Sequence, residues 1–163
     1  MTFTEREYRD VIGHFATGVS VMTTVDGDVP HGMTANSVAS VSLDPVLTLV
    51  CVERTTVMYE LIARTGVFAL SFLRAEQETI ARHFADGSRP SGAPQFEGIT
   101  HTTAATGSPI IDGAIGYLDC ELWAAYDGGD HLIVCGEVVA LGRGADAEPL
   151  LYYGSRYRAL PIT

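Results

Sequence analysis

Lysine is absent from this chain of 163 residues, so its ten basic residues are all arginines. They are scattered from Arg6 to Arg158, and twenty Asp and Glu residues leave a formal net charge of −10. No basic cluster could neutralise a row of phosphates, and we therefore expect no nucleic acid partner. The acidic surplus is typical of a chain that stays soluble.

Cysteine is scarce, and Cys51, Cys120 and Cys135 form no C-x-x-C pair. An odd number of cysteines in apolar runs argues against a disulfide framework and favours reduced, buried thiols inside a cell. The sequence also lacks the apolar run of a signal peptide and the roughly 20 apolar residues of a membrane span. We expect a cytoplasmic protein without a membrane partner.

Several kinds of site are excluded because their motifs are missing. No G-x-G-x-x-G follows a predicted strand and no G-x-x-x-x-G-K is present, which removes a Rossmann dinucleotide site and a P-loop. The five histidines show no H-x-x-x-H spacing and no neighbouring cysteine pair, so we expect no metal site. G-x-S-x-G is absent too, and with it the local signature of a hydrolase nucleophile.

The composition that is present suits a globular domain, with 47% hydrophobic residues and a mean hydropathy of +0.18. A chain of this length can bury one sizeable core, so we expect a single domain over residues 1–163. Thr4 and Glu7 form a capping-box pattern, and Gly66 is a typical helix stop. Helical spacing and caps predict three helices, at residues 4–16, 55–65 and 75–85.

The apolar runs between these helices are typical of β-strands. The hairpin signals are Asp26-Gly27-Asp28 and Gly128-Gly129, and the segment around residues 29–43 is expected to break near Gly32. Residues 86–95 concentrate Gly, Pro and Ser and predict a surface loop. Strands joined by hairpins, without β–α alternation, predict a mainly β fold, an antiparallel barrel. The predicted strand segments are residues 18–25, 29–43, 45–53, 67–73, 115–127 and 130–142.

Residues 31–45, HGMTANSVASVSLDP, are too polar for a strand in the core, and their pattern is too regular for a loose loop. Their short side chains offer many hydrogen-bond donors, and Gly32 would let the backbone approach a ligand without a Cβ in the way. Such a segment suits a phosphorylated, planar cofactor. An alternative remains open, in which the polar residues only form the solvent face of an alternating strand. The donors are Thr34, Asn36, Ser37, Ser40 and Ser42, and the alternative concerns Thr34, Asn36, Ser40 and Ser42.

Seven stretches resemble one known family, in order along the chain. They are FATGVSVMTT, HGMTANSVASVSLDPVLTLVCV, ARHFA, FEGI, TGSPIIDGAIGYLDCEL, GGDHLIVCGEV and PLLYYGSRY. From about Tyr8 to Tyr157 the chain is similar to the flavin reductase family, the reductase components of two-component flavin-dependent monooxygenases. The resemblance implies an FMN-binding split barrel, an antiparallel Greek-key β-barrel that usually forms a homodimer.

The resemblance also places a flavin, either FMN or FAD, on three segments. The backbone at Met33, Thr34 and Ala35 would meet the isoalloxazine edge, while Asn36 and Ser37 would face the ribityl chain and phosphate. The implied cofactor-binding residues are Pro30, His31, Gly32, Met33, Thr34, Ala35, Asn36, Ser37, Cys51, Val52, Glu53, Arg54, Thr55, Thr56, His83 and Phe84.

Some of these positions leave alternatives open. Thr55 and Thr56 stand at a predicted helix N-terminus, where backbone N–H groups favour a phosphate. Many relatives have Arg where this chain has His83, so Arg54 is a possible substitute for phosphate contact. Cys51, like Phe84, could equally be a plain core residue.

For the hydride donor, NADH or NADPH, the resemblance points to two other segments. His131 matches a histidine near the open flavin face and would position the nicotinamide, although a lone histidine at a strand start is often only a surface residue. The C-terminal segment associated with the pyridine nucleotide contributes Tyr152, Tyr153, Gly154 and Ser155.

The activity implied is that of an NAD(P)H-dependent flavin reductase. Hydride would pass from nicotinamide C4 to flavin N5, which needs no protein nucleophile and agrees with the missing catalytic motifs. Reduced flavin would then go to a separate monooxygenase. Two alternatives remain, namely another split-barrel enzyme, such as a pyridoxamine-phosphate oxidase or a deazaflavin-dependent reductase, and a barrel that binds flavin or haem without catalysis.

Overall fold

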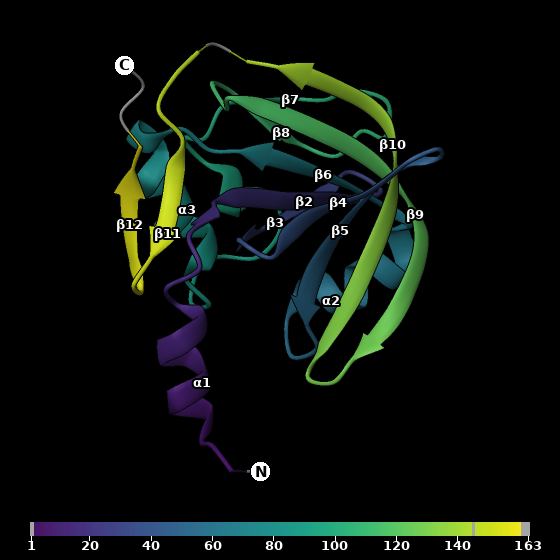
Figure 1. Ribbon diagram of the computed structural model, residues 1–163. Helices are drawn as coiled ribbons and strands as arrows, with labels where there is room; N and C mark the ends of the chain where they lie inside the picture. Colours follow the sequence, from purple (N-terminus) through teal and green to yellow (C-terminus); the bar gives the residue numbers. More distant parts are fainter. Residues whose placement is uncertain (1, 145, 161–163) are drawn as a thin grey trace.

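The computed structural model describes residues 2–144 and 146–160 of the chain (Figure 1). Every strand pair among these residues is antiparallel, which confirms the predicted mainly β fold with few helices. The helices are α1 (Glu5–Ile12), α2 (Val57–Thr65) and α3 (Glu78–Ala85), with 3-10 turns η1 (Ala75–Gln77) and η2 (Ala93–Phe96). The strands are β1 (Thr17–Gly18), β2 (Ser20–Asp26), β3 (Val29–Ala35), β4 (Val38–Leu43), β5 (Val46–Glu53), β6 (Val67–Phe72), β7 (His101–Thr102), β8 (Ile110–Ile111), β9 (Gly116–Gly128), β10 (His131–Arg143), β11 (Leu150–Tyr153) and β12 (Arg156–Ala159).

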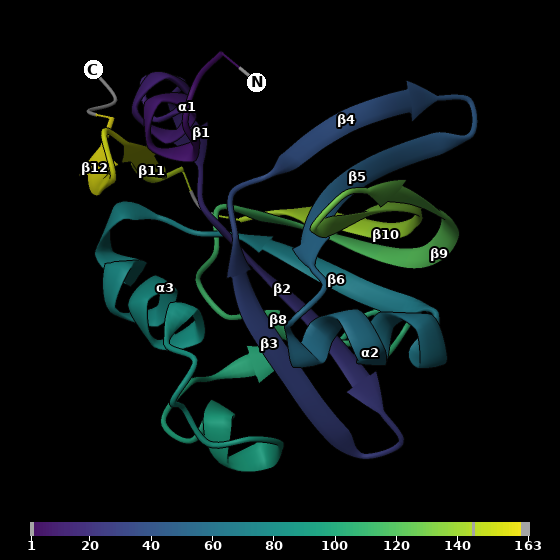
Figure 2. The same ribbon diagram turned by 90° about the horizontal axis from the view of Figure 1, so that it is seen from below.

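Seven strands form one sheet in the order β3-β2-β6-β9-β10-β5-β4. Its two edge strands, β3 and β4, are consecutive in the chain and are joined only by Asn36 and Ser37. The Cα atoms of Ala35 and Val38 can therefore lie at most about 11 Å apart, so the two edges meet and the sheet curls into a barrel. Beyond this link β3 and β4 diverge, as Figure 2 shows, and the opening between them is the split of the barrel.

The barrel interior is an apolar core that α2 closes from one end. The helix has Thr56 as N-cap and Gly66, with φ 65°, as C-cap, so the predicted stop is confirmed and the start lies two residues later than predicted. From it Met58 and Ile62 enter the core, where they are fully buried. The other buried members are Met22, Ala35, Val50, Val52, Phe68, Leu70, Cys120 and Val134.

A second core lies outside the barrel, where α3 covers β2 and β3. Val21 of β2 faces this second core while its neighbour Met22 faces the barrel interior. The segment around β2 is a strand as predicted, but both of its faces are buried rather than one. The second core consists of Val19, Val21, Leu73, Ala81, Phe84, Phe96, Ile111 and Leu150.

Both predicted hairpins are present. Asp26 pairs with Val29 across the first turn, and Gly128 pairs with His131 across the second. The break predicted near Gly32 is wrong, because β3 runs through that residue and the chain breaks later, between β3 and β4.

The predicted surface loop at residues 86–95 is only partly a loop. Its last residues form η2, and Gln95 and Phe96 are buried there. Hydrophobic periodicity could not reveal this, since the buried residue is a glutamine that hydrogen-bonds to β3.

The N-terminal helix stands apart from the barrel in both views (Figures 1 and 2). Thr4 and Glu7 form the predicted capping box, and all eight residues of α1 are exposed. The helix is connected to the C-terminal hairpin of β11 and β12 by a hydrogen bond from Gly154 N to Gly13 O, 2.8 Å long. Among the described helices, none has the length and apolar character needed to cross a membrane.

Candidate functional site

A cleft of about 590 Å³ opens at the split of the barrel, beside the link between β3 and β4. Its walls come from β3, the end of β5, the N-terminus of α2, the end of α3, the loop after α3 and the start of β10. The lining residues are His31, Met33, Thr34, Ala35, Asn36, Ser37, Cys51, Glu53, Thr55, Thr56, Val57, Phe84, Ala85, Gly87, Arg89, Pro90, Ser91 and His131.

The cleft brings together most of the residues that the family resemblance suggested. The suggested residues in its lining are His31, Met33, Thr34, Ala35, Asn36, Ser37, Cys51, Glu53, Thr55, Thr56, Phe84 and His131. The structure places the others outside this lining, namely Pro30, Gly32, Val52, Arg54, His83, Tyr152, Tyr153, Gly154 and Ser155.

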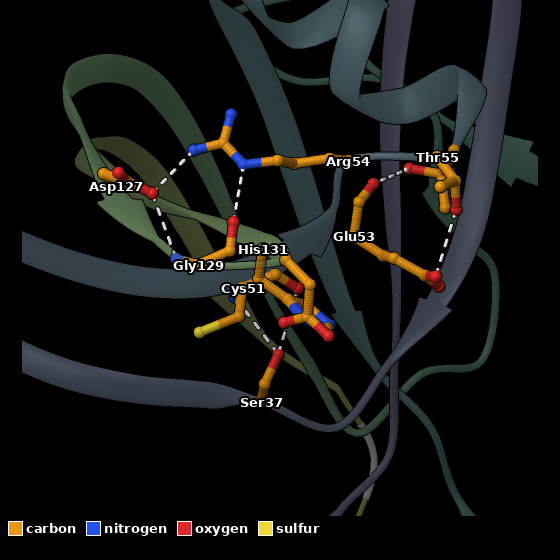
Figure 3. Close-up of polar contacts among 10 residues, drawn as sticks. Ser37, Cys51, Glu53, Arg54, Thr55, Asp127, Gly129 and His131 are labelled. Carbon is orange, nitrogen blue, oxygen red and sulfur yellow. Dashed lines mark hydrogen bonds and ion pairs between the residues drawn. The ribbon is translucent and has the colours of Figure 1, made fainter.

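The hydroxyl of Ser37 is already engaged within the protein. It accepts a hydrogen bond from Cys51 N and donates one to Cys51 O, both 3.1 Å long, and so joins the link to β5 (Figure 3). Asn36 is exposed and donates to Thr17 Oγ1 at 3.1 Å. The two side chains therefore shape the corner of the cleft, and Asn36 is the one better able to turn towards a ligand.

Gly32 serves the packing of α3 rather than the approach of a ligand. A Cβ on this residue would lie 2.7 Å from a ring carbon of Phe84, much closer than side chains tolerate. The Phe84 ring thus packs against the bare backbone of β3 at Gly32 and also lines the cleft. Val52 is fully buried in the barrel core, since its side chain alternates with those of Cys51 and Glu53.

The N-terminus of α2 faces the same cleft. Thr56 caps the helix by accepting a hydrogen bond from Tyr59 N, while Thr55 Oγ1 donates to the Glu53 carboxylate at 3.0 Å (Figure 3). Backbone N–H groups at a helix start favour negative charge, so this end of the cleft suits an anion.

Arg54 points away from the cleft. Figure 3 shows its side chain extending towards the turn between β9 and β10, where it donates to Asp127 Oδ1 and Gly129 O, each at 2.8 Å. It also donates to the Tyr59 hydroxyl at 3.0 Å. Its charge is therefore balanced by Asp127, whose carboxyl pKa is held low by hydrogen bonds from Gly129 N and Arg54.

Arg89 is the arginine that lines the cleft, and sequence reasoning missed it. Its guanidinium donates to Asp86 O at 2.7 Å and to Gly32 O, and its Nε is buried without a partner among the described residues. In that part of the chain it forms no ion pair with a carboxylate, and burial lowers its pKa. The available signal was an arginine in the polar loop directly after the matching stretch ARHFA.

Gln95 connects this loop to β3. Its side-chain Oε1 accepts from Gly32 N at 2.9 Å, and its Nε2 donates to Pro30 O at 3.2 Å and to Gly92 O at 3.0 Å. His83 contacts the backbone of Gln95, because its Nε2 lies 2.7 Å from Gln95 O. His83 therefore supports the wall of the cleft instead of lining it.

His31 is the one buried histidine of the cleft wall, with 7% of its surface exposed. Its Nδ1 lies 3.3 Å from Gln95 Nε2. Burial, together with the nearby charge of Arg89, lowers the pKa of His31 to about 4, so the ring is uncharged at neutral pH.

His131 lies at the mouth of the cleft, at the start of β10. Its Nδ1 is 2.7 Å from Asp130 Oδ1, and this contact holds the pKa of the Asp130 carboxyl below its usual range. Across the strands His131 pairs with Glu53. The contact with Asp130 thus orients the His131 ring, and with it the position of Nε2.

The C-terminal residues suggested for the pyridine nucleotide lie elsewhere in the same chain. Tyr152 packs on the second core and stacks edge-on with Tyr157, while Tyr153 contacts the ring of His14. Within one chain this hairpin does not reach the cleft.

The residues present fit a phosphorylated flavin. The cleft has the size usual for a small-molecule site, and short hydroxyl and backbone groups line much of it. Arg89 lines the cleft as a half-buried cation that forms no ion pair with a carboxylate of the described residues. A phosphate would balance its charge.

Comparison with known proteins agrees with this fit. The family model described as flavin reductase like domain matches residues 12–161. An NADH-dependent FAD reductase of Streptomyces globisporus is 46% identical over 153 residues, covering 93% of this chain and 84% of that protein. The reductase subunit HsaB of a flavin-dependent monooxygenase from Rhodococcus jostii is 38% identical, covering 95% of this chain and 77% of HsaB.

Solved structures of flavin reductases are also similar to this chain. The S. globisporus NADH:FAD oxidoreductase SgcE6 superposes with a TM-score of 0.92 at 40% identity, covering 99% of this chain and 96% of that chain. SgcE6 in complex with NAD and FAD fragments gives a TM-score of 0.89 at 42% identity, covering 96% of this chain and 93% of that chain. With a family model that spans nearly the whole sequence and relatives of this similarity, the chain belongs to the family of flavin reductase like domains.

Proposed function

We propose that this chain is an NADH-dependent flavin reductase that hands reduced flavin, preferentially FAD, to a separate monooxygenase. The observation that carries the proposal is the cleft at the split, in which Arg89 lines one wall and short polar side chains line much of the rest. The relatives described above include an NADH-dependent FAD reductase and a monooxygenase reductase subunit, which supports FAD as flavin and NADH as donor.

The residues of the chain bind and orient, because hydride transfer between a bound nicotinamide and a bound flavin needs no protein nucleophile. We assign the backbone of Met33, Thr34 and Ala35 to the flavin ring, and Asn36 to the ribityl chain. Thr34 is held in place, since its hydroxyl donates to Ala81 O at 2.7 Å. Arg89 is assigned to a flavin phosphate, and the α2 N-terminus is a second position that favours negative charge.

His131 is proposed to position the nicotinamide at the mouth of the cleft. Its contact with Asp130 orients the ring, which supports a positioning role. The proposed contact of the C-terminal hairpin with the nicotinamide requires a second copy of the chain, because the hairpin does not line the cleft of the same chain. The hairpin residues concerned are Tyr152, Tyr153, Gly154 and Ser155.

A homodimer is the assembly that we propose. Support comes from the apolar side chains that α1 and its flanks expose to solvent. A second copy that buried them would remove their apolar surface from water. These side chains are Phe3, Tyr8, Val11, Ile12 and Phe15.

Steady-state oxidation of NADH tests the activity. We expect oxidation to require added FAD or FMN, and in air to yield peroxide but no hydroxylated product from an aromatic substrate. Product should form only after a flavin-dependent monooxygenase is added. A protein that binds flavin but leaves NADH unoxidised would contradict the proposal and favour a flavin-binding barrel, and hydroxylation by this chain alone would contradict the two-component reading.

A further inference from the structure

The most specific arrangement in the cleft wall is the contact between His31 and Gln95, two residues 64 positions apart. Gln95 is fully buried, and every polar atom of its side chain is engaged. A buried amide with all its hydrogen bonds made has a defined orientation, and that orientation decides what its neighbour can be.

The orientation of the Gln95 amide follows from its backbone partners. Gly32 N is a donor, so the atom 2.9 Å from it must be the amide oxygen. Pro30 O and Gly92 O are acceptors, so the atom bonded to them must be the amide nitrogen. The atom that faces His31 Nδ1 is therefore the amide nitrogen, whose two hydrogens serve the two carbonyl oxygens and which cannot accept a hydrogen bond.

This contact determines the tautomer of His31. A proton on Nδ1 would point at an NH₂ group that cannot accept it, so Nδ1 carries no proton and the ring proton lies on Nε2. A second proton on Nδ1 would oppose the amide NH₂ group and the charge of Arg89, so the ring stays neutral.

Nε2 is the atom of the His31 ring that is available to donate a hydrogen bond to a ligand. Among the described residues it makes no hydrogen bond, and it is not one of their fully buried polar atoms without a partner, so it retains access to the cleft that His31 lines. Arg89 lines the same wall, and each of its terminal nitrogens, Nη1 and Nη2, carries a second hydrogen besides the one it donates to a backbone oxygen. Two donors side by side, one charged and one neutral, match the oxygens of a phosphate.

We infer that His31 is an uncharged Nε2–H donor to a flavin phosphate, beside Arg89, and that Gln95 is the positioning residue that fixes this tautomer. The inference rests on the proposed function for the identity of the ligand. The tautomer itself is a property of the protein alone, so it is measurable without flavin or NADH.

The first arm of the test reads the ring directly. Histidine ¹⁵N NMR of the full-length protein at pH 7 should show a neutral His31 with a protonated Nε2 and a bare Nδ1. Gln95→Met, which removes the facing NH₂ group, should let the Nδ1–H form appear. A charged ring, or an Nδ1–H tautomer in the unaltered protein, would overturn the inference; so would an unchanged tautomer in Gln95→Met.

The second arm uses substitutions that mimic one nitrogen each. Gln places an amide N–H near the position of Nε2, whereas Asn reaches only that of Nδ1. We expect His31→Asn and His31→Leu to raise the dissociation constant for FAD and FMN by about 10- to 100-fold, the range for a hydrogen bond to a charged group. His31→Gln should recover most of this loss, and His101→Asn, at an exposed histidine outside the cleft, serves as the matched control.

Riboflavin, which lacks the phosphate, completes the design. Its affinity should be the same in the unaltered protein and in His31→Asn. Equal losses for riboflavin and FMN, or equal losses in His31→Gln and His31→Asn, would show that His31 only packs and would overturn the inference. If the unaltered protein bound no flavin at all, the proposed function would fall, and the NMR arm would distinguish that failure from a wrong tautomer.

Discussion

Two arginines near the N-terminus of α2 and the loop after α3 differ in what balances their charge. Arg54 is paired with Asp127 across the turn of a hairpin 73 residues away, whereas Arg89 donates only to backbone oxygens. The family resemblance suggested Arg54 as a substitute for the arginine that many relatives have at the position of His83, and no local pattern could show that its partner lies in the turn between β9 and β10. The partner of a long, flexible side chain is decided by tertiary structure.

Substitution of each arginine by glutamine should show which of the two binds the flavin. We expect Arg89→Gln to raise the dissociation constant for FAD by about 10- to 100-fold, because a charge-assisted hydrogen bond to phosphate is lost. Arg64→Gln, which removes a surface arginine paired with Asp26, is the control for the change in net charge. The measurement is quenching of flavin fluorescence on binding, and a larger effect of Arg54→Gln than of Arg89→Gln would favour the sequence-based assignment.

His31 should make the stability of the fold depend on pH. Its folded pKa of about 4 lies below the ordinary 6.5, so the unfolded chain binds the proton first as the pH falls. Stability should therefore decrease on acidification between pH 6.5 and 4, by about 2 kcal/mol from pH 7.5 to 5 on account of this residue. The charge that acts on His31 is that of Arg89.

Urea unfolding at pH 7.5 and pH 5 checks this expectation. The difference in unfolding free energy between the two pH values should shrink by about the same 2 kcal/mol in His31→Gln. An undiminished difference in that variant would assign the acid sensitivity to other groups.

Among the elements, the three helices and the two hairpins follow from local signals that the structure confirms. Thr4, Thr56 and Gly66 bound helices because caps act within a few residues of themselves. The position of the break after β3 was mispredicted because Gly32 is glycine for a non-local reason, the ring of Phe84 on α3. The 3-10 turn η2 was missed for a similar reason, since Gln95 is buried by its bonds to β3.

Gly32→Ala tests how closely α3 packs on β3. A Cβ 2.7 Å from the Phe84 ring must displace that ring, and we expect a loss of about 1–3 kcal/mol in unfolding free energy together with weaker flavin binding. Gly18→Ala is the matched control, because a Cβ at that residue of β1 would meet nothing within 4 Å. Equal stability of the two variants would mean that α3 shifts without cost.

At the scale of the whole molecule, the topology explains why the cleft lies where it does. The barrel closes through the two residues between its edge strands, and the opening beside them gathers side chains from four distant parts of the chain. The sequence motifs identified most of these positions through the family resemblance. A contribution of the C-terminal hairpin to the cleft depends on a second copy of the chain, so the fold of one chain does not determine it.

The assembly is testable through α1. Replacing Tyr8 and Val11 together by Ser should convert a dimer into a monomer of 17.4 kDa, as measured by light scattering after gel filtration. Both side chains are exposed in the single chain, so the fold of the monomer should be unaffected, with unchanged circular dichroism. If the C-terminal hairpin serves a neighbouring cleft, the KM for NADH should rise at the same time. A doubly substituted protein that remained dimeric would place the interface elsewhere.

The amide of Gln95 has one more consequence, which concerns contacts between molecules. β3 is an edge strand, and such strands offer unused backbone groups to which a strand of another chain can add. By bonding to Pro30 O and Gly32 N, a single side chain imitates the peptide group of a neighbouring strand and occupies that edge. Arg89 covers Gly32 O in the same way. The loop after α3 therefore protects this edge of the barrel, beside the binding cleft, against strand addition and aggregation.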